Sequence, residues 1–148
     1  MILEPASAPT DAAEIRRWRI SAYHQLRTLR AELARAARTH AHLSAEVLEM
    51  MAVVVTELAT NALQHGSPPT VVRLCRTGDH LLLDVEDQHP EDAPELAADR
   101  PLGHGGLGLQ LVRSFASGVG WYTVAGTKHV WATFRSPSGG TDRVGGCW

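Results

Sequence analysis

Three polar side chains recur at four-residue steps inside an otherwise apolar stretch, residues 53–66. They are Glu57, Asn61 and His65, and this spacing places them on one stripe of an α-helix. An unpaired carboxylate or amide in a protein core costs several kcal/mol, so a mostly apolar helix normally carries such groups where its face lines a site. Glu57 is able to accept a proton, and the side-chain oxygen of Asn61 is a hard ligand suited to Mg²⁺. The solvent-facing stripe of an ordinary amphipathic helix has the same spacing, so the pattern alone leaves both interpretations open.

A second candidate, Asp87, directly follows an apolar strand predicted over residues 81–86. A carboxylate at a strand end can accept a hydrogen bond from an exocyclic amine, such as the one that adenine carries. Aspartate is also a common turn residue. Asp87 by itself therefore has two interpretations.

A glycine-rich segment, residues 103–109, reads Gly-His-Gly-Gly-Leu-Gly-Leu and opens a third predicted helix. Glycines allow the backbone to approach a ligand closely, and the N–H groups at a helix start bind phosphate. The segment lacks the Gly-Lys-Ser/Thr of a P-loop, and the other protein-kinase signatures are missing from the chain. A flexible hinge has a similar composition. The segment is therefore a candidate phosphate site, but its composition alone does not distinguish the two.

The elements that position these groups follow from hydrophobic periodicity and turn residues. Ser21 and Ser44 are the expected N-caps of the first two helices, and Gly66 is expected to end the second. Residues 87–106 are expected to form a long irregular segment, which at this length is usually a lid, a binding loop or a disordered segment. Strands are predicted over 15–20, 70–76, 81–86, 118–125 and 130–135, and helices over 21–38, 44–65 and 107–116.

This order of strands and helices favours an α+β two-layer sandwich. We expect one domain over residues 14–135, with flexible termini at 1–13 and 136–148. Residues 136–148 are expected to be flexible because they are rich in glycine and serine.

Composition excludes several classes of protein. The chain has 148 residues, 44% of them hydrophobic and 20% charged, as in one soluble globular domain. A formal net charge of −2 argues against a general nucleic-acid binder. Two cysteines, Cys75 and Cys147, make no disulfide framework. No signal peptide is evident and no apolar run reaches the ~18 residues of a membrane span, so we expect a cytoplasmic protein without membrane association.

In their order, the three motifs resemble those of the GHKL ATPases, which include the histidine-kinase catalytic domains and DNA gyrase. The residues that carry the resemblance are 57–66 (Glu-Leu-Ala-Thr-Asn-Ala-Leu-Gln-His-Gly), 87–90 (Asp-Gln-His-Pro) and 106–109 (Gly-Leu-Gly-Leu). The small size and the closing Lys128-His129-Val130-Trp131 are most similar to the anti-sigma-factor serine/threonine-protein kinases, in their stand-alone actinomycete form. The resemblance covers residues 14–135. It implies the Bergerat ATP-binding fold, a two-layer sandwich with a mixed, mostly antiparallel sheet.

The resemblance implies ATP and Mg²⁺ as cofactors and a role for each matching residue. Asn61 would bind the Mg²⁺ that bridges the phosphates, Glu57 would be the general base toward the attacking hydroxyl, and Asp87 would accept the adenine amine. Backbone N–H groups would face the phosphates in the last motif, which consists of Gly106, Leu107, Gly108 and Leu109. His65 matches a position that is often histidine in this branch, and packing at the helix end explains it equally well.

The match departs from the family at two places. Many relatives have Asp-x-Gly in the second motif, where this chain has Asp87-Gln88-His89. The last strand of the family commonly brings a threonine toward the adenine site. In this chain the better register predicts His129 at that position, with Thr127 two residues away.

The function implied is that of an ATP/Mg²⁺-dependent serine kinase and anti-sigma factor. It would phosphorylate an anti-sigma antagonist protein and, when released from it, bind a sigma factor, with a homodimer as the expected assembly. The arginine-rich face of the first helix is the surface expected to bind partners. Two alternatives stay open: a nucleotide-sensing binding protein without kinase activity, and the separated catalytic domain of a two-component histidine kinase. The sequence contains no helix pair with a phospho-acceptor histidine, which counts against the second.

Overall fold

Apolar residues recur at every second position in some segments and at every third or fourth in others, and the chain accordingly alternates between strands and helices. The computed structural model describes residues 5–9, 11–90 and 106–136. Its elements are β1 (Ala13–Ile20), a 3₁₀ turn η1 (Tyr23–Gln25), α1 (Leu26–His40), α2 (Ala45–His65), β2 (Thr70–Thr77), β3 (His80–Asp87), α3 (Gly106–Phe115), β4 (Gly118–Val124) and β5 (Thr127–Arg135). The segment predicted as a lid lies largely outside the described residues, as do residues 137–148.

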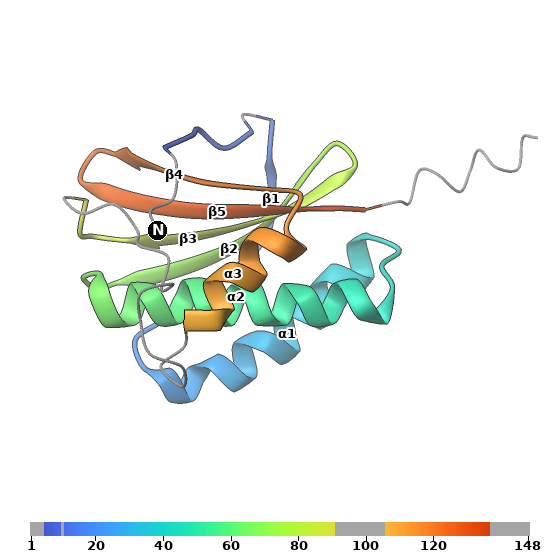
Figure 1. Cartoon of the computed structure of the whole chain (residues 1–148), viewed down its shortest axis with the longest axis horizontal. Coiled ribbons are helices and arrows are strands. Elements are labelled where there is room, and N and C mark those ends of the chain that lie inside the picture. Colours follow the sequence, from blue (N-terminus) through green and yellow to red (C-terminus); the bar gives the residue numbers. More distant parts are fainter. Residues whose placement is uncertain (1–4, 10, 91–105, 137–148) are drawn as a thin grey trace, which may run out of the picture.

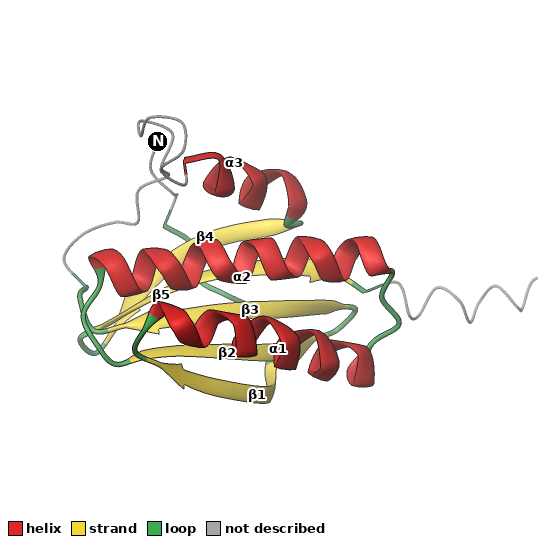
Figure 2. Ribbon diagram, turned by 90° about the horizontal axis from the view of Figure 1, so that it is seen from below, coloured by secondary structure: helices red, strands yellow, loops and turns green. Residues whose placement is uncertain are grey.

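The strands form one sheet in the order β1-β2-β3-β5-β4, and every pair of neighbouring strands is antiparallel. A parallel pairing occurs only as an isolated bridge between Pro5 and Trp121 among the residues described. The three α-helices of the described chain lie on one face of the sheet, with α2 between α1 and α3 (Figures 1 and 2). The predicted α+β two-layer sandwich is therefore confirmed.

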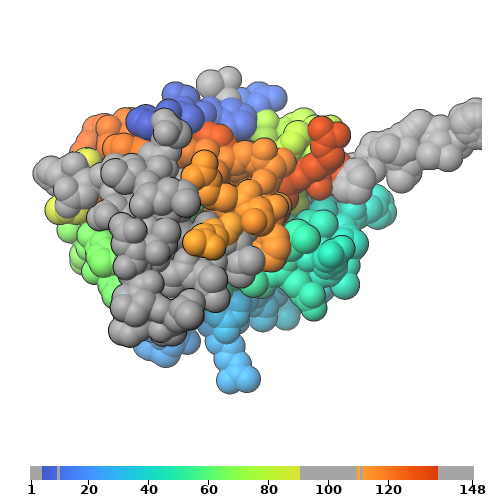
Figure 3. Space-filling model, in the orientation of Figure 1, coloured from blue at the N-terminus to red at the C-terminus, as the bar shows by residue number. Residues whose placement is uncertain are grey.

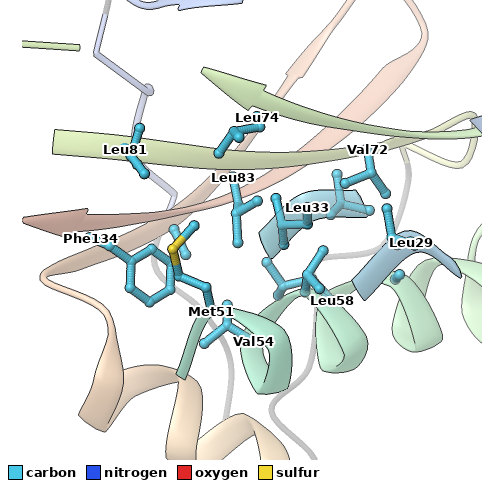
Figure 4. Close-up of a cluster of buried hydrophobic side chains, with 14 of the residues drawn as sticks. Leu29, Leu33, Met51, Val54, Leu58, Val72, Leu74, Leu81, Leu83 and Phe134 are labelled. Atoms are coloured by element: carbon cyan, nitrogen blue, oxygen red, sulfur yellow. The ribbon is translucent and has the colours of Figure 1, made fainter. Parts of the chain in front are cut away.

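The core lies between the sheet and the helices because each contributes one apolar face. Leu26, Leu29, Leu33 and Ala37 recur at three- and four-residue steps along α1, and all four are buried. Figure 4 shows how the two layers meet: Leu29 and Leu33 of α1 and Met51, Val54 and Leu58 of α2 lie against Val72, Leu74, Leu81, Leu83 and Phe134 of the sheet. Burial of such side chains contributes roughly 1.5–3 kcal/mol each. In the part of the chain that the structure describes, no helix is long and apolar enough to cross a membrane.

The start of the first helix differs from the prediction. Ser21 is not its N-cap, because the chain first makes the η1 turn and α1 begins at Leu26. The Gln25 side chain caps the η1 turn, because its Oε1 accepts hydrogen bonds from the backbone N–H of Ser21 (2.6 Å) and Ala22 (3.0 Å). It makes no side-chain cap bond to α1 itself. Tyr23 lies in the η1 turn and not on the buried face of α1, and it is 54% exposed.

The N-terminal segment, predicted to be loose, contacts the sheet wherever it is described. The Ala6 N–H donates to the Trp121 carbonyl oxygen (2.9 Å), and Trp131 Nε1 donates to the Ala6 carbonyl oxygen (2.8 Å). Thr77 Oγ1 donates to Asp11 Oδ1 (2.6 Å). Long-range hydrogen bonds of this kind leave no local pattern in the sequence, so periodicity does not reveal them.

Candidate nucleotide site

The polar stripe on α2 lies along the C-terminal half of the helix. Ser44 caps the start of α2 as predicted, with its side chain accepting a hydrogen bond from the Val47 N–H (3.1 Å). Glu57 and Asn61 are both half-buried, whereas His65 is exposed at the last turn. At 1.5 Å of rise per residue, Glu57 and Asn61 are separated by about 6 Å along the helix axis. Their partial burial favours a site-lining face over a fully solvated one.

The end of α2 and the end of β3 meet at Gly66 and Asp87. A Cβ atom added at Gly66 would lie 2.5 Å from Asp87 Cγ and 2.7 Å from the Ala62 carbonyl oxygen. The Gln88 N–H donates to the Ser67 carbonyl oxygen (2.9 Å), which ties the two chain segments together just beyond this contact. Gly66 ends the helix as predicted, but in an extended conformation (φ −93°, ψ −170°). The glycine is therefore needed for the close approach of Asp87 and not for a left-handed cap.

Asp87 is almost fully enclosed at this junction, with 2% of its surface exposed. Its Oδ1 accepts a hydrogen bond from the His89 backbone N–H (2.7 Å), and its Oδ2 lies 3.8 Å from Lys128 Nζ. Lys128 is itself 5% exposed. A buried carboxylate is costly unless it is paired, and the ammonium group supplies the opposite charge.

The predicted register, which put His129 at the position that faces the adenine site in the family, is wrong. The register pairs Asp87 with Lys128 and Glu86 with His129, and successive residues of a strand point to opposite faces. His129 lies on the outer face of the sheet, opposite the helices, where its Nδ1 contacts Asp84 Oδ2 (3.0 Å) and its ring stacks on Tyr122.

The outer face of the sheet carries a network of charged side chains. His129 belongs to this network and not to the helix-facing side of the sheet. Arg73 Nη1 lies 2.8 Å from Glu86 Oε1 and 3.1 Å from Asp84 Oδ2. Burial opposes ionisation of Glu86, but hydrogen bonds from Arg73 and Gln88, together with nearby positive charge, outweigh it and lower the pKa of Glu86. The charges in this network satisfy one another, so it is a structural feature of the sheet.

Cys75 lies on the same outer face and has no chemical role in the site. Burial raises the pKa of the Cys75 thiol to about 11. The thiol therefore stays protonated at neutral pH and is a poor nucleophile. It packs with Leu82 and Trp131 in a small apolar cluster separate from the main core.

The third motif belongs to α3, which begins at Gly106 as the glycine pattern predicted to within one residue. In both ribbon views the first turn of α3 lies beside the C-terminal half of α2 (Figures 1 and 2). Further along, Gln110, Arg113 and Ser114 are exposed, and Figure 3 shows α3 at the molecular surface. Gly106, Leu107, Gly108 and Leu109 provide the four N-terminal backbone N–H groups, which lack partners within an α-helix.

These groups fit a purine nucleotide with Mg²⁺. Asp87 packs on the backbone of Gly66, where any Cβ would overlap it, and this enclosed carboxylate can accept an exocyclic amine. Within the described residues, no group of three or more His, Cys, Asp or Glu side chains can hold a metal ion. Mg²⁺ commonly binds through one or two protein oxygens together with substrate phosphates and water, so the single amide oxygen of Asn61 suits it.

Sequence reasoning missed two contributors to the site, Lys128 and the close approach at Gly66. A signal for the first was present, because β5 alternates Lys128, Val130, Ala132 and Phe134 on one face. The last three belong to the main core. A lysine in line with three core residues indicates a buried position with a charged partner.

Replacement of Gly66 by alanine is expected to destabilise the fold and to weaken nucleotide binding together. The new methyl group would overlap the Asp87 carboxylate and the Ala62 carbonyl, and overpacking of this kind costs about 1–3 kcal/mol. Urea denaturation measures the first effect and calorimetry with ATP the second. Ser67→Ala, one residue along, is the control and should change neither. Unchanged stability of Gly66→Ala would show that Asp87 can move aside at little cost.

Comparisons with known proteins agree with this architecture. The model of the histidine kinase-like ATPase domain matches residues 21–134. Among solved structures, the chain is similar to that of the RsbU and RsbW domains of Rv1364c from Mycobacterium tuberculosis, with a TM-score of 0.56 and 20% sequence identity. The alignment covers 82% of this chain and 32% of the other, so it compares folds and not whole proteins. No curated protein matches. With most of its length matched by the family model, the chain belongs to the histidine kinase-like ATPase domain family.

Proposed function

We propose that this protein is an ATP- and Mg²⁺-dependent serine kinase of the anti-sigma-factor type, which phosphorylates an anti-sigma antagonist protein and sequesters a sigma factor. Membership of the histidine kinase-like ATPase family supports ATP binding. A solved structure with RsbU and RsbW domains has a similar fold, which makes this branch of the family the one to test first.

The observation that carries the proposal is the contact between Gly66 and Asp87. It joins the motif that holds Glu57 and Asn61 to the carboxylate that would select the base, although the two are separated in the sequence. A purine bound against Gly66 would place its phosphates along the polar stripe of α2, toward the start of α3. Base recognition and phosphate chemistry would thus be performed by one continuous surface.

Each residue has a separate task in the proposed reaction. Asp87 accepts a hydrogen bond from the exocyclic amine and orients the base, and backbone N–H groups of Gly106–Leu109 bind phosphate oxygens. Asn61 would hold Mg²⁺, which neutralises the charge that develops on the phosphates. Glu57 takes the proton from the serine hydroxyl while that oxygen forms a bond to the γ-phosphorus and the bond to the leaving ADP breaks. Phosphoryl transfer depends mainly on positioning and electrostatics, which this set of groups can supply.

The proposed protein partners would bind on the helical layer. The surface of α1 opposite its buried leucines carries Arg27, Arg35 and Arg38, all exposed. Exposed positive charge of this density favours association with acidic protein surfaces. We propose that the antagonist and the sigma factor each present an acidic surface to α1. We also propose a homodimer as the functional assembly.

Calorimetry with ATP tests the first part of the proposal. Wild-type protein should bind ATP with a Kd of roughly 1 μM to 1 mM, the usual range for enzyme substrates, and more tightly with Mg²⁺ than without it. Asp87→Asn should weaken binding about tenfold or more, because a charged acceptor is lost from an enclosed position. The control is Asp79→Asn, which makes the same substitution at an exposed aspartate in the β2–β3 turn and should have no effect. Absence of ATP binding by the wild type would refute every nucleotide-dependent function.

Incubation with labelled ATP separates a kinase from a nucleotide sensor. Proteins captured on the immobilised chain from the native host supply the candidate antagonists. Transfer of label to one serine, lost when that serine is replaced by alanine, supports the kinase. Tight ATP binding with no transfer to any captured protein supports the sensor instead.

A further inference from the structure

Lys128, the charged side chain next to Asp87, belongs to the closing segment 128–131, but the resemblance implies no role for it. Lys128 is the first residue of the inward-facing row of β5, and Val130, Ala132 and Phe134 continue that row into the core. With 5% of its surface exposed, Lys128 is among the few buried charged residues that the structure describes. Lysine is almost never fully buried unless it is paired, because burial of an unpaired ammonium group is costly. This position therefore calls for an explanation beyond packing.

The geometry of the pair leaves hydrogen-bonding capacity at Asp87. Its Oδ2 lies 3.8 Å from Lys128 Nζ, which is an ion-pair distance and longer than the 2.7–3.2 Å typical of an N–H···O hydrogen bond. Its Oδ1 accepts from His89 (2.7 Å), but a carboxylate offers about four lone-pair sites. The ammonium group carries three donors, so it too can serve more than one acceptor. A strong acceptor and a strong donor thus stand side by side at the end of the sheet.

The Watson–Crick edge of adenine has the complementary arrangement. Its exocyclic amine, N6, is a donor, and the adjacent ring nitrogen, N1, is an acceptor. Enzymes read base edges through such paired hydrogen bonds. The Asp87 carboxylate packs directly on the backbone of Gly66, where any side chain would overlap it, so the position of this acceptor is fixed by the end of α2.

We propose that Lys128 is a specificity-determining residue of the nucleotide site, whose ammonium group donates a hydrogen bond to N1 of adenine while Asp87 accepts from N6. This inference rests on the proposed ATP binding and deepens it, because it names the second group that reads the base. The alternative is that Lys128 only neutralises Asp87 and never touches the ligand. Only a hydrogen bond from Lys128 would make Lys128 responsible for a dependence of the ATP affinity on N1 of adenine.

The decisive probe is 1-deaza-ATP, in which N1 is replaced by a C–H group while N6 is kept. Wild-type protein should bind it about 10- to 100-fold more weakly than ATP in calorimetry, the range expected for a hydrogen bond to a charged donor. Lys128→Met removes the donor and should bind ATP and 1-deaza-ATP with equal affinity. Lys128→Gln keeps a neutral N–H donor and should restore part of the preference. His129→Gln, on the outer face beside Lys128, is the matched control and should retain the full wild-type preference.

The outcomes separate this inference from the proposed function. Wild-type protein that binds ATP and 1-deaza-ATP equally well overturns the role of Lys128, even if Asp87→Asn still weakens ATP binding. An identical preference in Lys128→Met and wild type overturns it as well. Failure of the wild type to bind either nucleotide refutes both proposals. If Lys128→Met does not fold, as judged by thermal denaturation without ligand, the comparison of the two nucleotides on wild-type protein still decides the question.

Discussion

Replacement of Glu57 by glutamine is expected to lower the rate of phosphoryl transfer to serine by about 10²- to 10⁴-fold, the usual contribution of a general base. Glutamine keeps the size and the carbonyl oxygen of glutamate but cannot accept the proton from the attacking hydroxyl. ATP binding should be nearly unchanged, because Glu57 is assigned to the nucleophile and not to the nucleotide. A loss of kcat with an unchanged Kd for ATP is thus the signature of this residue.

The measurement is a single-turnover assay with the captured antagonist, with ATP affinity measured in parallel by calorimetry. Glu49→Gln is a matched control, since Glu49 is an exposed glutamate two turns earlier on the same helix. This variant should retain wild-type turnover. A Glu57→Gln protein with normal turnover would exclude Glu57 as the base. A parallel loss of ATP affinity would move its role to nucleotide or metal binding.

Replacement of Asn61 by alanine is expected to remove the dependence of ATP affinity on Mg²⁺ and to reduce phosphoryl transfer by about 10²-fold or more. A metal ion at the phosphates supplies several kcal/mol of transition-state stabilisation, and each 1.36 kcal/mol is a factor of ten in rate. Alanine is the best helix former, so the substitution should not destabilise α2 through loss of helix propensity. The loss can therefore be attributed to the missing oxygen ligand.

Calorimetry with ATP at several Mg²⁺ concentrations measures this effect. Asn61→Asp keeps an oxygen ligand at the same position and should retain dependence on Mg²⁺. Gln64→Ala, which removes an exposed amide at the next-to-last residue of α2, should behave as wild type. A Mg²⁺ dependence that survives in Asn61→Ala would place the metal on other groups.

Local patterns predicted the elements well because each pattern has a local cause. The start of α2 follows from one hydrogen bond between the Ser44 side chain and the Val47 N–H, three residues away. The buried face of α1 follows from helical spacing alone. Where the prediction failed, a competing local interaction prevailed: the Gln25 side chain accepts from the backbone N–H groups of Ser21 and Ala22, so the chain makes the η1 turn before α1 begins. Both arrangements are compatible with the sequence, so only the folded backbone decides between them.

Positions across the sheet were harder to predict, because the register of two strands depends on distant contacts. A shift of one residue moves every side chain of a strand to the opposite face. The predicted register therefore assigned His129 to the adenine side of the sheet, whereas the structure places Lys128 beside Asp87 and His129 among the charges of the outer face.

The sequence by itself determined the order of strands and helices, the α+β layering and the polar stripe of Glu57 and Asn61, because these depend on periodicity and capping within one segment. It also identified Asp87 as a candidate from its place after an apolar strand. The tertiary structure alone decided that Asp87 packs on the backbone of Gly66 and that Lys128 is the charge beside it. These contacts join residues from different elements, and only the packing of the sheet against the helices brings them together.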